Sequence, residues 1–221
     1  KGYLDRGGTK EVAIDTRVIT RKGCERVIRT AFELGKGRRG APKDGKHRAT
    51  CVDKSNVMAG CRLFRAIYDE VASEYPDFER DYAYIDAFTQ WLVRNPEHYD
   101  VVVTTNMLGD IATDLASVLQ GGMGMAASGN VGDKHAMFEG VHGSAPKHAG
   151  KNTTNPIASI LSASMLCDWL GRTRSDDKLS RAGRLLESAI AEVLADGKRL
   201  TYDLGGKAST SDVGLAIRER L

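Results

Sequence analysis

Two aspartates that follow an apolar run near the middle of the chain could hold a metal ion. Asp110 and Asp114 lie four residues apart in NMLGDIATDLASVLQGG, just after DVVVT. Residues spaced by four share one face of a helix, so both carboxylates would point to the same side. Mg²⁺ prefers carboxylate oxygens, and Asp86 is a possible third ligand from elsewhere in the chain. An ordinary surface helix is the alternative, because Asp110 near a helix N-terminus would also offset the helix dipole.

A lysine and a histidine are the other side chains that could take part in chemistry. Lys54 follows an apolar run in CVDKSN, where partial desolvation would let it act as a base; an ordinary surface lysine is the alternative. His142 lies among small residues in EGVHGSAPKHAG, where it could stack on a base or be a simple loop histidine. The glycine-rich GGMGMAASG follows a predicted helix rather than a strand, so it is weak support for a phosphate-binding loop.

Strand-like and helix-like segments alternate along the chain, which predicts an α/β fold. Strands are expected at 11–20, 47–56, 81–86 and 99–105, and helices at 21–35, 57–75, 87–96, 109–122, 156–171, 178–197 and near the C-terminus. Residues 121–156 form a long, irregular, glycine-rich stretch of the kind that often carries function. Lys54, Asp86 and the two later aspartates fall at strand-to-helix junctions, where ligands collect in α/β sheets.

Composition narrows the classes of partner. The 221 residues carry a net charge of only +3, which does not favour nucleic acid, and no apolar run is long enough to span a bilayer. The basic stretch 35–48 is expected to be a solvated loop. The four cysteines have no C-x-x-C spacing, which predicts buried free thiols in a reducing cytoplasm.

Five motifs, taken in order, resemble one family. VDKSN is similar to the segment that carries a catalytic lysine, and YIDAF to the segment that carries a metal aspartate. YDVVVTTNMLGDIATDLAS resembles the signature N-x-x-G-D-x-x-x-D, and FEGVHGSAPKHAGKNTTNP an adenosine-binding loop. LTYDLGG is similar to the closing turn on the cofactor side. Together they identify the chain as a member of the β-decarboxylating dehydrogenases, which include isocitrate and 3-isopropylmalate dehydrogenases and have a non-Rossmann α/β fold.

The resemblance implies oxidation and decarboxylation of a 2-hydroxy acid, isocitrate first and 3-isopropylmalate next. It implies that Asp86, Asp110 and Asp114 hold Mg²⁺ or Mn²⁺, that Lys54 and Asp86 are catalytic, and that Lys54 and Asn56 contact substrate. In such enzymes the lysine and one aspartate are lent by a partner subunit, so a homodimer with a shared active site is expected.

The resemblance also implies a site for a nicotinamide cofactor. The expected residues are Glu139, His142, Gly143, Ser144, Ala145, Pro146, Lys147, His148, Asn155 and Tyr202. Cations at positions 147 and 148 suit a 2′-phosphate, where NAD enzymes of the family have an acid, so NADP is favoured over NAD. Gly206 departs from this pattern, because some NADP enzymes have an arginine there.

The chain also departs from the family at its front. It has no R-x-x-x-R-x-x-x-R cluster for substrate carboxylates and no R-E-N-T/S-E-x-x-Y segment, so we expect an N-terminal part to be missing. Residues 1–120 would then form a dimerising domain that carries the metal and substrate residues, and 121–221 half of a cofactor domain. The alternatives are an inactive subunit that binds nucleotide or a partner, and a metal-dependent α/β hydrolase.

Overall fold

The structure is a computed structural model that describes residues 3–6 and 9–221, with side chains described from Val12 onward. The chain divides into two compact units, Lys1–Thr113 and Asp114–Leu221, and each is described by itself. The functional division expected near residue 120 stays a prediction.

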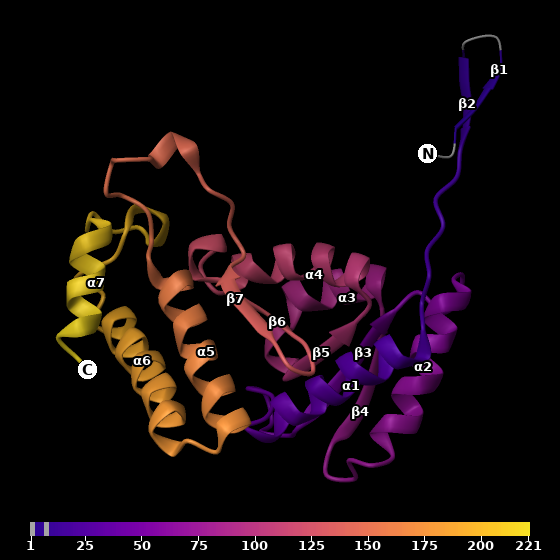
Figure 1. The fold of residues 1–221 in the computed structure, drawn as a ribbon, viewed down its shortest axis with the longest axis horizontal. Helices are drawn as coiled ribbons and strands as arrows, with labels where there is room; N and C mark the ends of the chain where they lie inside the picture. The colour runs from indigo at the N-terminus through magenta and orange to yellow at the C-terminus, as the bar shows by residue number, and fades with distance from the viewer. Residues whose placement is uncertain (1–2, 7–8) are drawn as a thin grey trace. The chain divides into compact units, whose positions relative to one another are not determined.

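A three-stranded parallel sheet organises the N-terminal unit (Figure 1). Its strands are β3 (Arg48–Asp53), β4 (Glu79–Tyr84) and β5 (Val101–Thr104), in the order β4-β3-β5. The helices α1 (Arg21–Lys36), α2 (Ala59–Ala72), α3 (Ile85–Arg94) and α4 (Asn106–Leu119) alternate with these strands, and a 3₁₀ turn, η1 (Pro96–His98), precedes β5. An antiparallel pair, β1 (Tyr3–Arg6) and β2 (Thr9–Ala13), precedes them.

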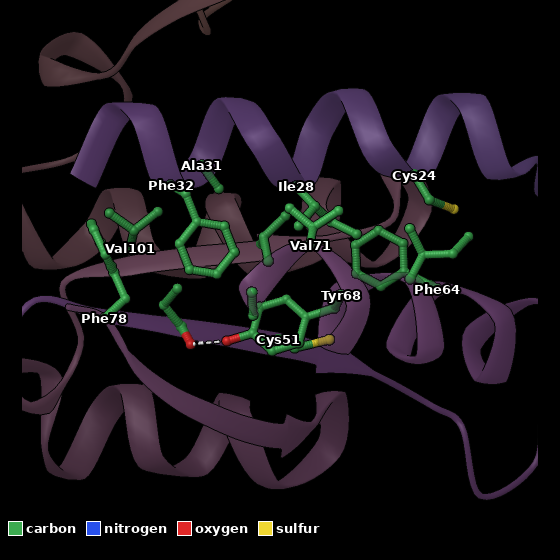
Figure 2. Close-up of a cluster of buried hydrophobic side chains, with 14 residues drawn as sticks. Cys24, Ile28, Ala31, Phe32, Cys51, Phe64, Tyr68, Val71, Phe78 and Val101 are labelled. Atoms are coloured by element: carbon green, nitrogen blue, oxygen red, sulfur yellow. Dashed lines mark hydrogen bonds between the residues drawn. The ribbon is translucent and has the colours of Figure 1, made fainter. Parts of the chain in front are cut away.

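The core of this unit lies where α1 and α2 pack on the sheet (Figure 2). Phe32 of α1 stacks on Tyr75 and meets Phe78 edge to face. The buried Tyr68 donates a 2.6 Å hydrogen bond from its hydroxyl to the carbonyl of Ala49, which satisfies its one polar group within the core. All six residues of β3 are buried, as expected for a central strand covered on both faces.

Two long helices lie side by side in the C-terminal unit, and the first of them packs against a small hairpin (Figure 1). The helices are α5 (Ile157–Arg174) and α6 (Asp177–Asp196), and the hairpin is β6 (Ala127–Val131) with β7 (Ala136–Gly140). The helix α7 (Thr210–Arg218) closes the unit, and short 3₁₀ turns occur at Met123–Met125, Pro146–His148 and Tyr202–Leu204. Its core gathers Ile157, Ile190, Val193, Val213 and Ile217.

Three sequence predictions about these elements were wrong in part. The strand expected at 11–20 ends at Ala13, and Thr20 at the far end of this stretch instead caps α1 by accepting a hydrogen bond from the backbone N–H of Gly23. The stretch 121–156 contains the hairpin β6–β7, whose strands ASGNV and AMFEG have few β-branched residues and so gave no clear strand signal. Helix α5 continues to Arg174, three residues beyond the expected end, and Ser175 ends it in a left-handed conformation.

Two other predictions need smaller corrections. Arg48, at the end of the basic stretch, is buried rather than solvated, because Glu79 and Asp44 pair with its guanidinium. All four cysteines are free thiols, but Cys167 is only half-buried whereas Cys24, Cys51 and Cys61 are buried. Across the described residues, no helix is both long and apolar enough to cross a membrane.

Candidate active site

Lys54 and Asp86 meet at the carboxyl end of the parallel sheet. Lys54 follows the last residue of β3, and Asp86 is the second residue of α3, directly after β4. Because β3 and β4 are parallel neighbours, with Asp53 opposite Tyr84, their exits lie side by side. The ammonium of Lys54 donates a 2.6 Å hydrogen bond to Oδ1 of Asp86. The structure thus brings together the two residues expected to be catalytic.

The two partners differ in their access to solvent. The Lys54 side chain is 26% exposed, whereas that of Asp86 is 65% exposed. The hydrogen bond from Lys54 lowers the pKa of Asp86, and a backbone hydrogen bond adds to this effect. Asp86 is therefore ionised near neutral pH, and most of its side chain remains open to solvent. Asn56, the expected substrate contact, is exposed in the turn that follows Lys54.

Asp110 and Asp114 are exposed and lie one turn apart in α4, as their spacing predicts. Within the described part of the chain, no three histidine, cysteine, aspartate or glutamate side chains form a group that could hold a metal ion. The expected metal role of Asp86, Asp110 and Asp114, and the shared site that the family resemblance implies, stay predictions.

A pocket of about 400 Å³ in the C-terminal unit gathers most of the expected cofactor residues. Those that line it are His142, Gly143, Ser144, Ala145, His148, Asn155 and Tyr202. This volume falls in the range of sites that bind small molecules and cofactors. Pro146 and Lys147 lie in the same turn without lining the pocket, and Glu139 is exposed on β7. The cofactor role of these residues stays a prediction.

Asn155 fixes one wall of this pocket. It is almost fully buried, its amide nitrogen donates to Oδ2 of Asp203 at 3.0 Å, and its amide oxygen accepts from the backbone N–H of Ile157 at 3.0 Å. One side chain therefore ties the start of α5 to the turn at Tyr202–Leu204. Gly124 approaches this pair so closely that a Cβ there would lie 2.8 Å from Asp203.

An aromatic pair forms another part of the pocket. The rings of His148 and Tyr202 are stacked, with centroids 5.8 Å apart and an interplanar angle of 10°. Ala145, just before the turn that carries His148, adopts a left-handed conformation with φ of 44°, which is strained for a residue with a Cβ. Strain of this kind is found at sites whose geometry is held by their surroundings.

Sequence reasoning missed other residues of both sites. Thr154, Asp203 and Thr210 line the pocket, and the hydroxyl of Thr210 donates a 2.6 Å hydrogen bond to the carbonyl of Thr154. Asp203 could have been found from the sequence, because it follows Tyr202 in the motif LTYDLGG. Thr210 lies outside the quoted motifs, and only the fold brings it to the pocket. Near Lys54, the buried Asp53 and its partly exposed partner Arg65 were also missed.

Comparison with known proteins decides the family. A model of the isocitrate/isopropylmalate dehydrogenase family matches residues 2–217. The chain belongs to the isocitrate/isopropylmalate dehydrogenase family. The family predicted from the five motifs is therefore confirmed.

Individual relatives agree with this assignment. The chain is 44% identical over 211 residues to a 3-isopropylmalate/3-methylmalate dehydrogenase of Methanocaldococcus jannaschii, with 95% of this chain and 60% of the relative covered. It is 42% identical to the NADP isocitrate dehydrogenase of Thermus thermophilus, with 96% of this chain and 41% of the relative covered. The crystal structure of isocitrate dehydrogenase from Methylococcus capsulatus superimposes with a TM-score of 0.86 at 38% identity, covering 99% of this chain and 62% of that chain.

These matches confirm the predicted α/β fold of the isocitrate/isopropylmalate dehydrogenase type. This chain spans 60% of the length of the Methanocaldococcus relative and 41% of the Thermus relative.

Proposed function

We propose that the protein containing this chain oxidises and decarboxylates a 2-hydroxy acid, with Mg²⁺ or Mn²⁺ and with NADP in preference to NAD. The observation that carries the proposal is the pairing of Lys54 with Asp86 at the carboxyl end of the sheet. It has support from the relatives, whose names include isopropylmalate, homoisocitrate and isocitrate dehydrogenases. Isocitrate is the first substrate candidate and 3-isopropylmalate the second.

In this proposal the ammonium of Lys54 first gives a proton to solvent, and the neutral amine then takes the proton from the substrate hydroxyl during oxidation. Asp86 holds the ammonium of Lys54 by the 2.6 Å hydrogen bond and fixes its direction. Asn56, exposed in the same turn, contacts the substrate. A base is effective only when it is oriented toward the proton that it removes, and a paired carboxylate supplies that orientation.

The donor set that this chain offers suits a hard divalent cation. Asp110 and Asp114 present two exposed carboxylates from one helix, and Asp86 presents a third from α3. We propose that a second copy of the chain brings its Asp86 and Lys54 to complete the site, which makes the functional form a homodimer. A bound metal would supply Lewis acidity to the substrate hydroxyl and to the charge left after decarboxylation.

The pocket at His142–Ala145 is proposed to hold the adenosine end of the cofactor. The stacked pair His148 and Tyr202 offers aromatic faces, and the small residues 143–145 allow close approach of backbone to ligand. Lys147, exposed in the same turn, would face a 2′-phosphate, and Glu139 would lie toward the nicotinamide end. Asn155 would keep the pocket open through its bonds to Asp203 and Ile157.

An assay of NADP reduction tests the proposal. The protein should reduce NADP only when a divalent cation and isocitrate or 3-isopropylmalate are both present. Asp110→Asn should remove most of this turnover, while Asp133→Asn, an exposed control on the hairpin loop, should retain it. Nucleotide binding without turnover by the wild-type protein would instead favour a non-catalytic subunit. Full activity of Asp110→Asn would contradict the metal assignment.

A further inference from the structure

A buried carboxylate directly precedes Lys54 in the chain. Asp53 is the last residue of β3, and its side chain is 0% exposed. Its Oδ2 accepts a 2.7 Å hydrogen bond from Nε of Arg65, and its Oδ1 accepts one of 3.1 Å from Nη2. The same Oδ1 accepts a 2.9 Å hydrogen bond from the backbone N–H of Ser55. Three hydrogen bonds therefore converge on the carboxylate that lies next to the candidate base.

These bonds hold the backbone of Lys54 on both sides. The bond from Ser55 to Asp53 closes an Asx-turn around Lys54. The carbonyl of Lys54 accepts from the backbone N–H groups of Val57 at 3.1 Å and Met58 at 2.9 Å. The side chain of Lys54 therefore leaves the backbone from a fixed point and in a fixed direction.

Arg65 links this turn to the aromatic side chains of β4. Its guanidinium lies 5.2 Å from the ring centroid of Tyr82 and 5.3 Å from that of Tyr84. The ammonium of Lys54 lies 5.9 Å from the same Tyr84 ring. The cations of Arg65 and Lys54 are therefore both attracted to aromatic rings of β4, and they share the ring of Tyr84. This attraction favours placing both charged groups beside β4.

Stability alone is a weak reason for this arrangement. Burying the Asp53 carboxylate completely and the Arg65 guanidinium in part is costly, and an apolar pair of similar volume is often equally stable or more so. We propose that Asp53 and Arg65 are positioning residues for Lys54, which lock the turn after β3 so that the ammonium points at Asp86. The inference rests on the proposed function for the role of Lys54 as base, but the geometry can be tested without turnover.

The test compares variants that keep or lose parts of the network. Asp53→Asn keeps the oxygen that accepts from Ser55 but loses the charge that pairs with Arg65, and Arg65→Met removes the guanidinium. Arg65→Lys keeps the charge without the two-point contact. Arg29→Met is the matched control, because Arg29 makes a two-point contact with Glu74 on the surface. Circular dichroism first establishes that each variant is folded.

The first readout is the reactivity of the Lys54 amine toward an N-hydroxysuccinimide ester, measured by peptide mass spectrometry. Asp53→Asn and Arg65→Met should label Lys54 at least threefold faster than the wild-type protein, with Arg65→Lys in between. Lys46, which pairs with Glu79 at 2.8 Å, is the internal control and should label at an unchanged rate. Arg29→Met should change neither lysine.

The second readout is the separation of kcat from KM in NADP reduction. Asp53→Asn and Arg65→Met should lower kcat about tenfold or more with KM values within twofold, and Arg65→Lys should recover part of the loss. Unchanged labelling of Lys54 in the folded variants, or a change matched by Arg29→Met, overturns the inference. Wild-type turnover by Lys54→Met would refute the proposed role of Lys54 as base. The labelling result would still show whether Asp53 and Arg65 position the Lys54 side chain. If Asp53→Asn does not fold, Arg65→Met and Arg65→Lys test the same inference with the same readouts.

Discussion

The ammonium of Lys54 donates a 2.6 Å hydrogen bond to the carboxylate of Asp86, although 32 residues separate them in the sequence. The contact exists because β3 and β4 are parallel neighbours whose carboxyl ends lie at one edge of the sheet. A lysine and an aspartate expected to act together are therefore placed together within one chain. Both residues, with Asn56, belong to the same unit, so a partner subunit would receive them as a preformed set.

Removal of either member of this pair should abolish most turnover. Lys54→Met and Asp86→Asn should each lower kcat by about 10²-fold or more, because general acid–base catalysis contributes on this scale. The rate of NADP reduction at saturating substrate measures the effect. Lys46→Met is the control, since Lys46 pairs with Glu79 in a comparable way away from the proposed site. Wild-type kcat in Lys54→Met would show that another group is the base.

Charge reversal at Lys147 should change the choice of cofactor. Lys147→Asp should lower kcat/KM for NADP by roughly 10- to 100-fold, because it exchanges a charge-assisted hydrogen bond worth about 1.5–3 kcal/mol for repulsion of the 2′-phosphate. The value for NAD should change little, since NAD has no such phosphate. Lys178→Asp, an exposed control in α6, should leave both values unchanged. An equal loss for NAD and NADP would count against a phosphate contact.

The buried guanidinium of Arg48 should make its partner Glu79 important for stability. The Arg48 side chain is 3% exposed, and its Nε donates to Glu79 at 2.8 Å while Nη2 donates to Asp44 at 2.7 Å. Glu79→Gln should lower the free energy of unfolding by about 1–3 kcal/mol, because it leaves a buried charge incompletely paired. Urea unfolding measures the change.

A matched control for this prediction is Glu74→Gln. Glu74 pairs with Arg29, and both side chains are about half exposed. A surface pair of this kind contributes at most about 1 kcal/mol. Equal losses of unfolding free energy in Glu79→Gln and Glu74→Gln would show that the burial of Arg48 does not determine the size of the destabilisation.

Acid should destabilise the fold through carboxylates that are bound to cations. Hydrogen bonds from Arg48 lower the pKa of Glu79 and of Asp44, and a hydrogen bond from Lys54 lowers that of Asp86. A carboxyl whose pKa is lower in the folded state stabilises the fold while ionised, and this contribution is lost as pH falls through the folded-state pKa. The melting temperature should therefore be level from about pH 8 to 5 and fall below about pH 4.

Differential scanning calorimetry across this pH range checks the prediction. Because the side chains of Asp44, Glu79 and Asp86 are 30%, 39% and 65% exposed, 0.5 M salt should make the fall shallower by screening their charges. A melting temperature that holds steady down to about pH 3 would contradict the assigned pKa shifts.

The sequence alone determined the family and most of the regular elements. The run NMLGDIATDLAS and the loop HGSAP are local patterns, so their residue types and spacing can be recognised in the sequence without knowledge of the fold. Helices α1, α2 and α4 follow from apolar residues at helical spacing, and β3 from a short apolar run. The hairpin β6–β7 did not follow, because its strands ASGNV and AMFEG contain few residues that favour strands and are fixed by pairing with each other rather than by intrinsic preference.

The tertiary structure alone decided which residues surround the candidate site. Asp53 and Arg65 lie twelve residues apart, and only the packing of α2 beside β3 makes their charges meet. Thr210 likewise reaches the pocket of His148 because α7 returns to Thr154, 56 residues earlier. Contacts of this kind depend on burial and on long-range pairing, which a residue type and its neighbours do not encode. The sequence therefore named the groups that could do chemistry, and the fold decided which other groups hold them in place.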